Sequence, residues 1–587
     1  MKKIISSIFV IALAAIIVFS FTNDAFLSSG SNSDDSKSLS VNNSSKKENN
    51  RTADIINTKK LTSKFKKVDL FSFNKYPKDR KSLNDFVRTA STLKLNKEKI
   101  RQLNRSAQQN MEFVIPVSET EKMVLELTQH TILSSDFILV SKKLSGEKPE
   151  QYTPGIYYKG IIKGDNNSMA AISIFEDKVM GVISNVSGNY NLGEIKNESS
   201  SFNEDYIFYN DADLLVTNNF QCDVDDYDAK FVRDIKEASN NINYDNGANS
   251  DVATLPVKMY FEADYQMYLD YNSNLSEVGN YITNVFNVVT TLYSYENIPI
   301  QIKRIAVWTS TDPYTYLNDS YSILLEFGGR TQDEFEGNLA HLLSTRNAGF
   351  GGIAWIRVLC MEFSPQDSAG RFAFSNIDTT YSIFPTYSWT VMVITHETGH
   401  NLGSMHTHAC VWPVSYSGLG AIDSCYYAEV WNCFSGTQAN YNGTIMSYCH
   451  LNGAISLTQG FGPLPGDTVR LRYNQAPCLQ QTLNSSENPL TFDLMQNYPN
   501  PFNPGTNLKF AIPHDANITL HVFDINGREI ALLLSGRFYS KGTYSHYFDS
   551  QKYSLSSGIY FYQLIATDPS KGGQVVHSKV KKMLLVK

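Results

Sequence analysis

The sequence lacks a long apolar run after its first 20 residues, an excess of basic charge, and a high cysteine content. A membrane-spanning helix needs about 20 apolar residues, so we expect no stable span in the mature protein. Lys+Arg 51 against Asp+Glu 58 gives a net charge of −7, which excludes a global basic field for nucleic acid. With seven cysteines, 19% charged and 42% hydrophobic residues, a disulfide-only scaffold and wholesale disorder are excluded too.

The N-terminus begins with two lysines followed by an apolar run, a pattern typical of a secretory signal peptide. The run is short for a membrane span, so we expect removal near residue 25, with an uncleaved anchor as the alternative. Export makes disulfides permissible.

Changes in composition and hydrophobic period divide the chain. Residues 257–262 and 298–308 read as strands around a helix at 271–293, which predicts an α/β (α+β) unit with a mixed sheet. The expected order is a signal peptide (1–25), a disordered linker (26–60), a mostly β domain (61–222), a cleavable linker (223–252), the α/β unit (253–480), a linker (481–492) and a small β-sandwich (493–587).

One motif carries the chemistry: His396-Glu397-Thr-Gly-His400-Asn-Leu-Gly403-Ser-Met-His406. Histidines four residues apart lie on one helix face, so both imidazoles can reach one metal ion. Gly403 can end the helix and bring His406 back as a third ligand, which favours it over His408. Three neutral nitrogens leave a fourth zinc position open, as in catalytic sites. Glu397 is placed to serve as general base, and then as acid for the leaving amine.

A second motif follows downstream, Gly443-Thr-Ile-Met446-Ser-Tyr448-Cys. Together the two motifs resemble those of the metzincin metallopeptidases, and residues 257–478 resemble the adamalysin/reprolysin group. The resemblance implies a metzincin fold with an active-site helix and one catalytic zinc ion. It also implies that Met446 forms an apolar floor beneath the ligands, a plain core methionine being the alternative.

Three positions depart from the reprolysin pattern. Thr407 follows the third histidine, where reprolysins usually have Asp. Lys258 and Asn338 stand at the calcium-site acids, so calcium is not predicted. Tyr448 stands where astacin-like and serralysin-like relatives place a tyrosine that can donate a hydrogen bond to the oxyanion of the transition state. A core aromatic is the alternative for Tyr448.

An edge strand beside the cleft is predicted near residues 349–357. In the family this strand pairs with the substrate backbone by β-augmentation, and an ordinary strand is the alternative. The residues expected to take part are Gly351, Gly352, Ile353, Ala354 and Trp355.

Six cysteines fall inside the α/β unit, which in an exported protein suggests three disulfides. Loose likeness to reprolysins favours the pairs Cys360–Cys478, Cys410–Cys449 and Cys425–Cys433.

The segment before the α/β unit, especially 157–190, resembles the reprolysin propeptide. Cys222 closes this segment just before the cleavable linker, so its thiolate could fill the open zinc position and keep a zymogen latent. Asp223 could do so as a carboxylate, and a thiol without function is the third alternative.

The last domain opens with Met495-Gln-Asn-Tyr-Pro-Asn-Pro-Phe-Asn-Pro504 and ends in a basic segment, 579–587. It resembles the C-terminal sorting domain of the type IX secretion system of Bacteroidetes and related bacteria. The resemblance implies the type IX machinery as a partner and export across both membranes of a Gram-negative bacterium, to the medium or the cell surface. An accessory carbohydrate- or protein-binding sandwich is the alternative.

These features predict a secreted zinc-dependent endopeptidase, made as a latent zymogen, that acts on protein or peptide substrates. The alternative class is a surface-displayed binding protein on a metzincin scaffold with a non-catalytic zinc. Glu397 argues against that class, because a scaffold has no use for a general base.

Overall fold

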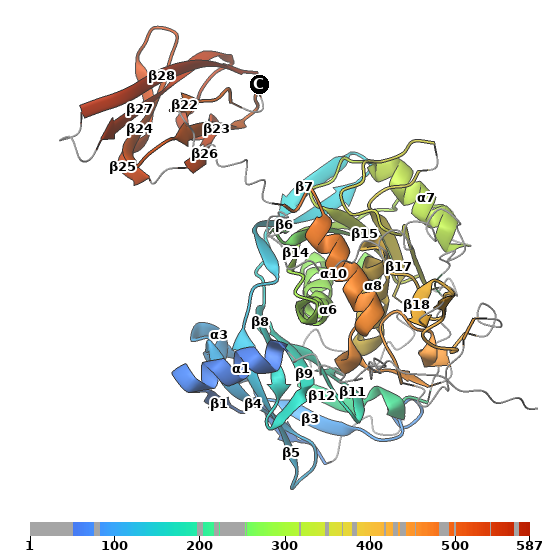
Figure 1. Ribbon diagram of the computed structural model, residues 1–587. Coiled ribbons are helices and arrows are strands. Elements are labelled where there is room, and N and C mark those ends of the chain that lie inside the picture. The colour runs from blue at the N-terminus through green and yellow to red at the C-terminus, as the bar shows by residue number, and fades with distance from the viewer. Residues whose placement is uncertain are drawn as a thin grey trace, which may run out of the picture. The chain divides into compact units, whose positions relative to one another are not determined.

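The computed structural model describes much of the chain (Figure 1). Within the described residues, no helix combines the length and the apolar character needed to cross a membrane. The predicted signal peptide, most of the linker 26–60, the linker 223–252 and residues 481–491 lie outside them. The described residues are 51–75, 83–195, 204–215, 222, 253, 255–315, 319–346, 351–366, 368–377, 384, 386–415, 418–426, 433–434, 442–451, 453–480, 492–497, 500–539, 542–568 and 574–586.

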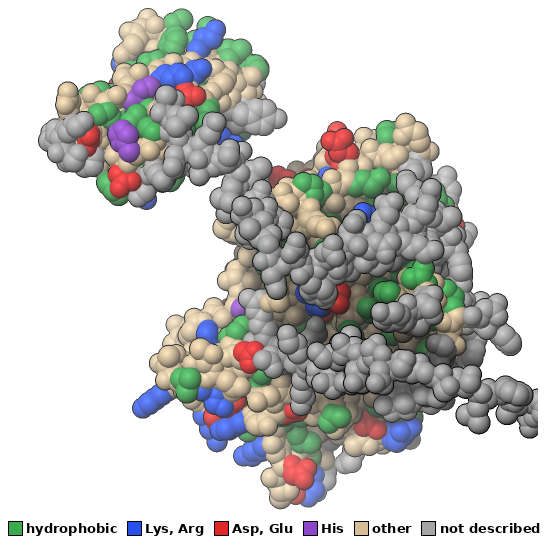
Figure 2. Space-filling model, in the orientation of Figure 1, with side chains coloured by type: hydrophobic (Ala, Val, Ile, Leu, Met, Phe, Trp, Pro, Cys, Tyr) green, Lys and Arg blue, Asp and Glu red, His purple; other side chains and the backbone are tan. Residues whose placement is uncertain are grey.

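Residues 51–215, here called the N-terminal unit, contain a ten-stranded sheet of order β1-β4-β5-β8-β9-β10-β11-β12-β3-β2. Its neighbouring strands are antiparallel apart from the parallel pair β1 and β4. Basic and acidic side chains are interspersed on the viewed face of this unit (Figure 2). The elements are β1 (Lys66–Val68), β2 (Phe71–Phe73), β3 (Ser91–Leu95), α3 (Lys97–Arg105), β4 (Asn110–Pro116), β5 (Lys122–Gln129), β8 (Ile156–Ile162), β9 (Asp165–Ile174), β10 (Val179–Asn185), β11 (Gly188–Glu194), β12 (Asp205–Asn210) and the 3₁₀ turn η1 (Asp211–Asp213).

Helix α1 (Arg51–Thr62) overlaps the end of the predicted disordered linker, so that prediction is wrong for residues 51–60. Ala53 and Ile56 are buried and pack with Ile161 of β8. Lys60 forms an ion pair of 2.8 Å with Glu126 of β5. This segment has too few apolar residues to show a helical pattern in the sequence. The helix depends on its tertiary contacts, which the sequence of the segment does not reveal.

The α/β unit is built on a seven-stranded sheet of order β16-β17-β15-β13-β14-β6-β7. Strand β13 pairs in parallel with both β14 and β15, and β16 runs antiparallel to β17 at one edge. The predicted strand-helix-strand segment corresponds to β13, α6 and β14. The elements are β13 (Val257–Ala263), α5 (Tyr265–Asp270), α6 (Leu275–Tyr295), β14 (Ile300–Trp308), α7 (Ser320–Thr331), β15 (Leu339–Ser344), β16 (Gly352–Ala354), β17 (Phe372–Asn376), α8 (Tyr387–Asn401), β18 (Trp412–Ser415), β19 (Gly418–Gly420), β20 (Asn442–Gly443), η2 (Cys449–Leu451), β21 (Ala454–Ile455), η3 (Leu457–Gln459) and α10 (Pro463–Gln475).

Strands β6 (Leu133–Lys143) and β7 (Gly146–Glu150) form a hairpin within the segment predicted as a separate β domain, yet they extend the sheet of the α/β unit. β6 pairs in parallel with β14, and Leu139 and Val140 are buried in the α/β core. The boundary predicted at residue 222 is therefore corrected for residues 133–150. Alternation of apolar residues predicts a strand but does not identify its partner, which here lies far along the chain.

Helix α6 lies between the two large sheets. Phe286 meets Phe261 of β13 edge-on at 5.5 Å between ring centroids. On the N-terminal unit, the amide of Asn287 donates to Ser173 Oγ at 3.1 Å. The helix begins after Asn274, whose side chain accepts hydrogen bonds from two first-turn N–H groups, as an N-cap should. Its position joins the N-terminal unit to the α/β unit through one shared element.

The C-terminal unit consists of a three-stranded sheet, β22-β23-β26, and a four-stranded sheet, β25-β24-β27-β28. Side chains of both sheets contribute to one apolar core. A turn at Asn526-Gly527 joins β24 to β25, and Gly527 has a φ of 77°. The elements are β22 (Asp493–Leu494), β23 (Gly505–Ile512), β24 (Ala516–Phe523), β25 (Glu529–Tyr539), β26 (Gly542–Asp549), η4 (Gln551–Tyr553), β27 (Gly558–Asp568) and β28 (Gln574–Leu585).

Three disulfides are present in the α/β unit, and two of them differ from the predicted pairs. Cys360–Cys478 is the pair expected. Cys410 pairs with Cys433, and Cys425 pairs with Cys449, instead of Cys410–Cys449 and Cys425–Cys433. The β18–β19 hairpin brings the Cys433 backbone to Ala421, near Cys410, a proximity that spacing along the chain does not reveal.

Replacing Asn274 by Ala should lower the free energy of unfolding by about 1 kcal/mol, because two N–H groups of α6 lose their acceptor. Ser276→Ala, at an exposed neighbouring position, is the matched control. Chemical denaturation of the full chain measures both variants. Equal stability of the two would show that this cap contributes nothing.

Candidate metal centre and active site

Helix α8 carries His396, Glu397 and His400, all buried. It contains no Lys, Arg or Asp, and its apolar residues are part of the α/β core. The helix ends where Gly403 adopts a left-handed φ of 91° and its N–H donates to the His400 carbonyl at 2.7 Å. This turn returns the chain toward the helix and places His406 beside His400.

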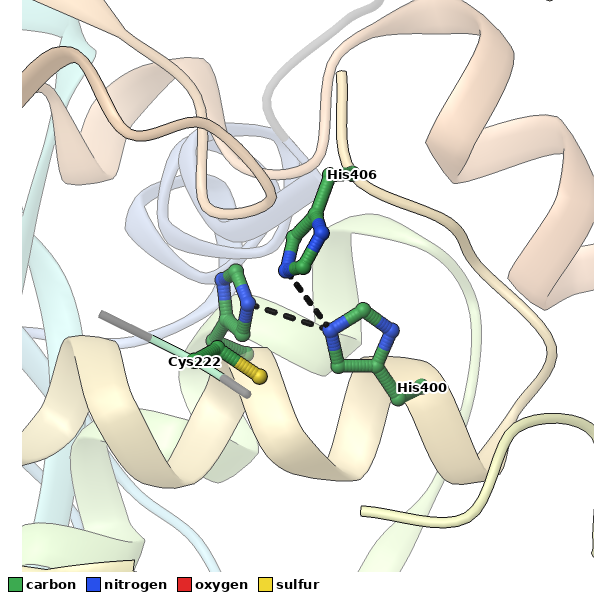
Figure 3. A group of neighbouring side chains, drawn as sticks. Cys222, His400 and His406 are labelled. Carbon is green, nitrogen blue, oxygen red and sulfur yellow. Dashed lines mark hydrogen bonds between the residues drawn. The ribbon is translucent and has the colours of Figure 1, made fainter. Parts of the chain in front are cut away.

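The three histidines converge through their Nε2 atoms. His400 Nε2 lies 3.1 Å from His396 Nε2 and 3.2 Å from His406 Nε2. Figure 3 shows the labelled His400 and His406 rings turned toward each other, with Cys222 beside them. Zinc bound tetrahedrally at about 2.05 Å from each nitrogen would separate the nitrogens by about 3.3 Å. The observed spacing therefore fits one zinc ion.

Backbone carbonyls orient the two helix imidazoles. His396 Nδ1 donates to Ile445 O at 2.7 Å, and His400 Nδ1 donates to Ser404 O at 2.8 Å. A ring that donates from Nδ1 to a carbonyl keeps a lone pair on Nε2, as a metal ligand must.

Burial lowers the pKa of each of the three imidazoles well below the ordinary value for histidine. Their mutual proximity adds to the effect for His396 and His400, and His408 adds to it for His406. The three rings are therefore neutral, and neutral imidazole is the form that binds metal.

Met446 lies directly against helix α8. A Cβ at Gly399 would lie 2.8 Å from the Met446 sulfur, so only glycine admits this close approach. Met446 is fully buried, and its carbonyl accepts the Thr407 N–H at 3.0 Å. The methionine thus contacts the helix between the two histidines and also holds the backbone next to His406.

Cys222, which precedes the α/β unit in the sequence, lies beside the three histidines. Its Sγ belongs to one group with the nitrogens of the three histidines, all within 4.8 Å of one another. The same Sγ donates to Glu397 Oε2 at 3.4 Å. Cys222 is buried, and it lies beside Gly352 in a parallel bridge. The thiol and the carboxylate of Glu397 therefore share the space above the imidazoles.

Tyr448 holds the backbone of Cys222 at both polar groups. Its hydroxyl accepts the Cys222 N–H at 2.8 Å and donates to the Cys222 carbonyl at 2.5 Å. The phenol ring lies edge-on to His406, with 4.8 Å between centroids. The hydroxyl therefore lies within reach of the site and is engaged by Cys222.

The predicted edge segment contains β16, shorter than expected at Gly352–Ala354, and pairs with β17. Next to it, Asn376 N donates to Gly351 O at 2.6 Å, and Trp355 N donates to Phe372 O at 3.3 Å. A Cβ at Gly352 would overlap Oε1 of Glu397 and lie 2.7 Å from its Cδ. Gly352 thus leaves the room that the Glu397 carboxylate occupies.

Two contacts near the third histidine were missed by sequence reasoning. Trp412 Nε1 donates to the His406 carbonyl at 2.7 Å and holds that turn. His408 stacks on His406 with an interplanar angle of 14°, and it is not among the described donors that converge with His396. A tryptophan soon after the motif was the available signal. Asp223, the alternative latency ligand, lies outside the described residues.

Residues 254–455 match the family described as metallo-peptidase family M12, and residues 496–577 match the secretion system C-terminal sorting domain. The snake venom metalloproteinase trimerelysin-2 of Protobothrops flavoviridis is 27% identical over 156 residues, covering 26% of this chain and 72% of that protein. The snake venom metalloproteinase TM-1 of Protobothrops mucrosquamatus is 27% identical over 159 residues, covering 26% and 73%. The crystal structure of metalloproteinase-II from Bacteroides fragilis covers 57% of this chain and 94% of that one, at 11% identity and a TM-score of 0.29.

Replacing Gly352 by Ala should displace the Glu397 carboxylate by about 1 Å and lower kcat/KM for peptide hydrolysis by about 100-fold. Metal content should not change, since the three imidazoles are not touched. Gly329→Ala on α7 is the control, because its Cβ would meet Ser368 Oγ at an ordinary 3.7 Å. Unchanged kcat/KM in the Gly352 variant, measured on linker-cut protein, would show that Gly352 does not set the position of the Glu397 carboxylate.

Proposed function

We propose that this chain, whose residues 254–455 are a zinc metalloendopeptidase domain of family M12, is the latent zymogen of an enzyme that cleaves extracellular proteins. Its sorting domain, residues 496–577, directs it through the type IX system to the medium or the cell surface. The observation that carries the proposal is the buried group of Cys222, His396, His400 and His406, with the thiol in contact with Glu397.

His396, His400 and His406 would hold the zinc ion, which supplies Lewis acidity and a water of lowered pKa. Glu397 follows the first ligand on α8, and its carboxylate faces the space above the imidazoles. In that place the carboxylate takes a proton from the attacking water and later gives it to the leaving amine.

Tyr448 is the candidate for stabilising the oxyanion. Its hydroxyl is within hydrogen-bond distance of a peptide carbonyl in the site, that of Cys222. Once Cys222 is gone, the same O–H can donate to the carbonyl oxygen of a substrate as negative charge develops on it.

The edge strand β16 would bind the substrate backbone. Its pairing with β17 on one side leaves the other side to Cys222, which lies beside Gly352. An extended peptide in the place of Cys222 would add a strand beside β16. The hydrogen bonds of the peptide's main chain would then supply affinity that does not depend on its side chains. Proteins and peptides in extended form are the substrate class that fits.

Latency follows from the same contacts. Cys222 Sγ lies where the attacking water would be, Glu397 is engaged by the thiol, and the Tyr448 hydroxyl is engaged by the Cys222 backbone. With zinc present the sulfur would bind as a thiolate and complete a closed four-ligand set. Cleavage within residues 223–252 would allow Cys222 to leave the site.

Glu397→Gln should leave zinc bound and lower kcat by roughly 10²–10⁴-fold, because the amide cannot take the proton. Zinc content by atomic absorption and casein hydrolysis by linker-cut protein are the two measurements. Glu362→Gln, an exposed carboxylate of the same unit, should behave as the parent does. Proteolysis retained in the Glu397 variant would overturn the mechanism.

Cys222→Ser should raise peptide hydrolysis by the uncut chain about 10-fold or more, since the latent arrangement loses its sulfur ligand. A denaturing gel must show that the chain is intact, and a zinc chelator must remove the gain. If the uncut variant stays as silent as the parent, the thiol is not what keeps the protein latent.

A further inference from the structure

The N-terminal unit is attached to the α/β unit by a shared sheet, in addition to the contacts that Cys222 makes further along the chain. β6 pairs in parallel with β14 from Leu133 to Lys142, and β7 then pairs with β6 and forms the edge. Figure 1 shows the β6–β7 hairpin, in cyan, beside β14. Removal of β6 would leave the backbone groups along this side of β14 without their sheet partners.

A buried ion pair connects β6 to the centre of that sheet. Glu262 of β13 has no exposed surface, and its Oε2 accepts from Lys142 Nζ of β6 at 2.7 Å. Tyr260 donates to Oε2 at 2.7 Å, while Trp308 Nε1 at 2.5 Å and Tyr314 donate to Oε1. The Glu262 carboxylate is thus fully surrounded by donors, and its positive partner comes from the N-terminal unit.

Glu262 is held in its charged form by these partners. Burial by itself raises the pKa of Glu262, but the Lys142 charge and the hydrogen bonds outweigh burial and leave the pKa below its ordinary value. Loss of β6 would leave a buried carboxylate without its cation, which is strongly unfavourable.

Further contacts of the same segment act alongside this pair. Asp136 forms an ion pair with Lys303 of β14, and Glu147 of β7 forms one of 3.1 Å with Arg304. On α6, Asn287 Oδ1 lies 2.7 Å from the His130 ring.

We propose that the N-terminal unit is a strand-donating subunit of the enzyme that stays bound after the chain is cut between residues 223 and 252. Hydrolysis of one peptide bond there adds one water and leaves a new carboxylate and a new amine. The cut then permits withdrawal of Cys222 from the histidines, while β6 remains in the sheet. The proposal rests on the zymogen function argued above.

The test uses the full chain with the recognition sequence of a site-specific protease placed within residues 240–249. In a Glu397→Gln background, which prevents self-digestion, the cut protein is followed by size-exclusion chromatography over a dilution series. The two fragments should co-elute and separate only in denaturant. Fragments that separate under native conditions would overturn the proposal.

Lys142→Met should raise the dissociation constant of the two fragments by about 100-fold or more, because Glu262 loses its cation. Lys148→Met, in the same hairpin with a side chain 77% exposed, should leave it unchanged. The double variant Lys142→Met/Glu262→Gln carries no buried charge and should recover part of the affinity. It also keeps the test valid if Lys142→Met alone fails to fold. Equal affinities in all four proteins would overturn the role of the ion pair.

Activity in the native Glu397 background separates this proposal from the zymogen function. Hydrolysis of casein by the co-eluting cut complex supports both. Hydrolysis that begins only after the N-terminal fragment is stripped away or degraded overturns the proposal and leaves the zymogen function standing. If the cut complex and uncut Cys222→Ser are both silent, the proposed function fails, while co-elution still supports the strand-donating interface.

Discussion

Convergence of three neutral imidazoles at one buried point is the constraint on which the rest of the structure depends. Nitrogens 3.1 and 3.2 Å apart, each with a lone pair facing the same space, repel one another until a metal or a proton lies between them. The fold holds them there through the carbonyls of Ile445 and Ser404 and through the rigid spacing of α8. A loop alone would relax the arrangement; His396 and His400 are on a helix buried in the core, and the turn at Gly403 brings His406 to them.

The same crowding decides which residues can surround the site. Two positions in close contact with residues of the site are glycines: Gly399 packs against Met446, and Gly352 packs against Glu397. Cys222 lies beside Gly352 of β16, the strand proposed to bind the substrate backbone. In the proposed zymogen, latency and catalysis compete for the same groups, since both the Glu397 carboxylate and the Tyr448 hydroxyl are engaged by Cys222.

Local sequence was enough to predict the candidate centre, because its geometry follows from spacing on one helix. His396 and His400 are one turn apart, and Gly403 is the residue that permits the turn toward His406. Features that depend on distant pairing were not predictable. The partners of Cys410 and Cys425 are decided by how the β18–β19 region folds back, and β6 gave a strand signal that did not identify β14 as its neighbour. Glu262 looked like an ordinary strand residue, since its cation, Lys142, lies 120 residues away.

The two attachments of the N-terminal unit differ in the way their energies depend on the intact chain. In the proposed zymogen the intact chain tethers Cys222 on both sides, and a cut between residues 223 and 252 leaves it tethered on one side only, which lowers its effective concentration at the site. The β6–β7 hairpin instead fills one side of a sheet and neutralises a fully buried carboxylate, and a cut elsewhere in the chain changes neither contact. One cleavage can therefore weaken inhibition without weakening the fold. Placing the inhibitory cysteine and the stabilising strand at different points of the same segment makes that separation physically possible.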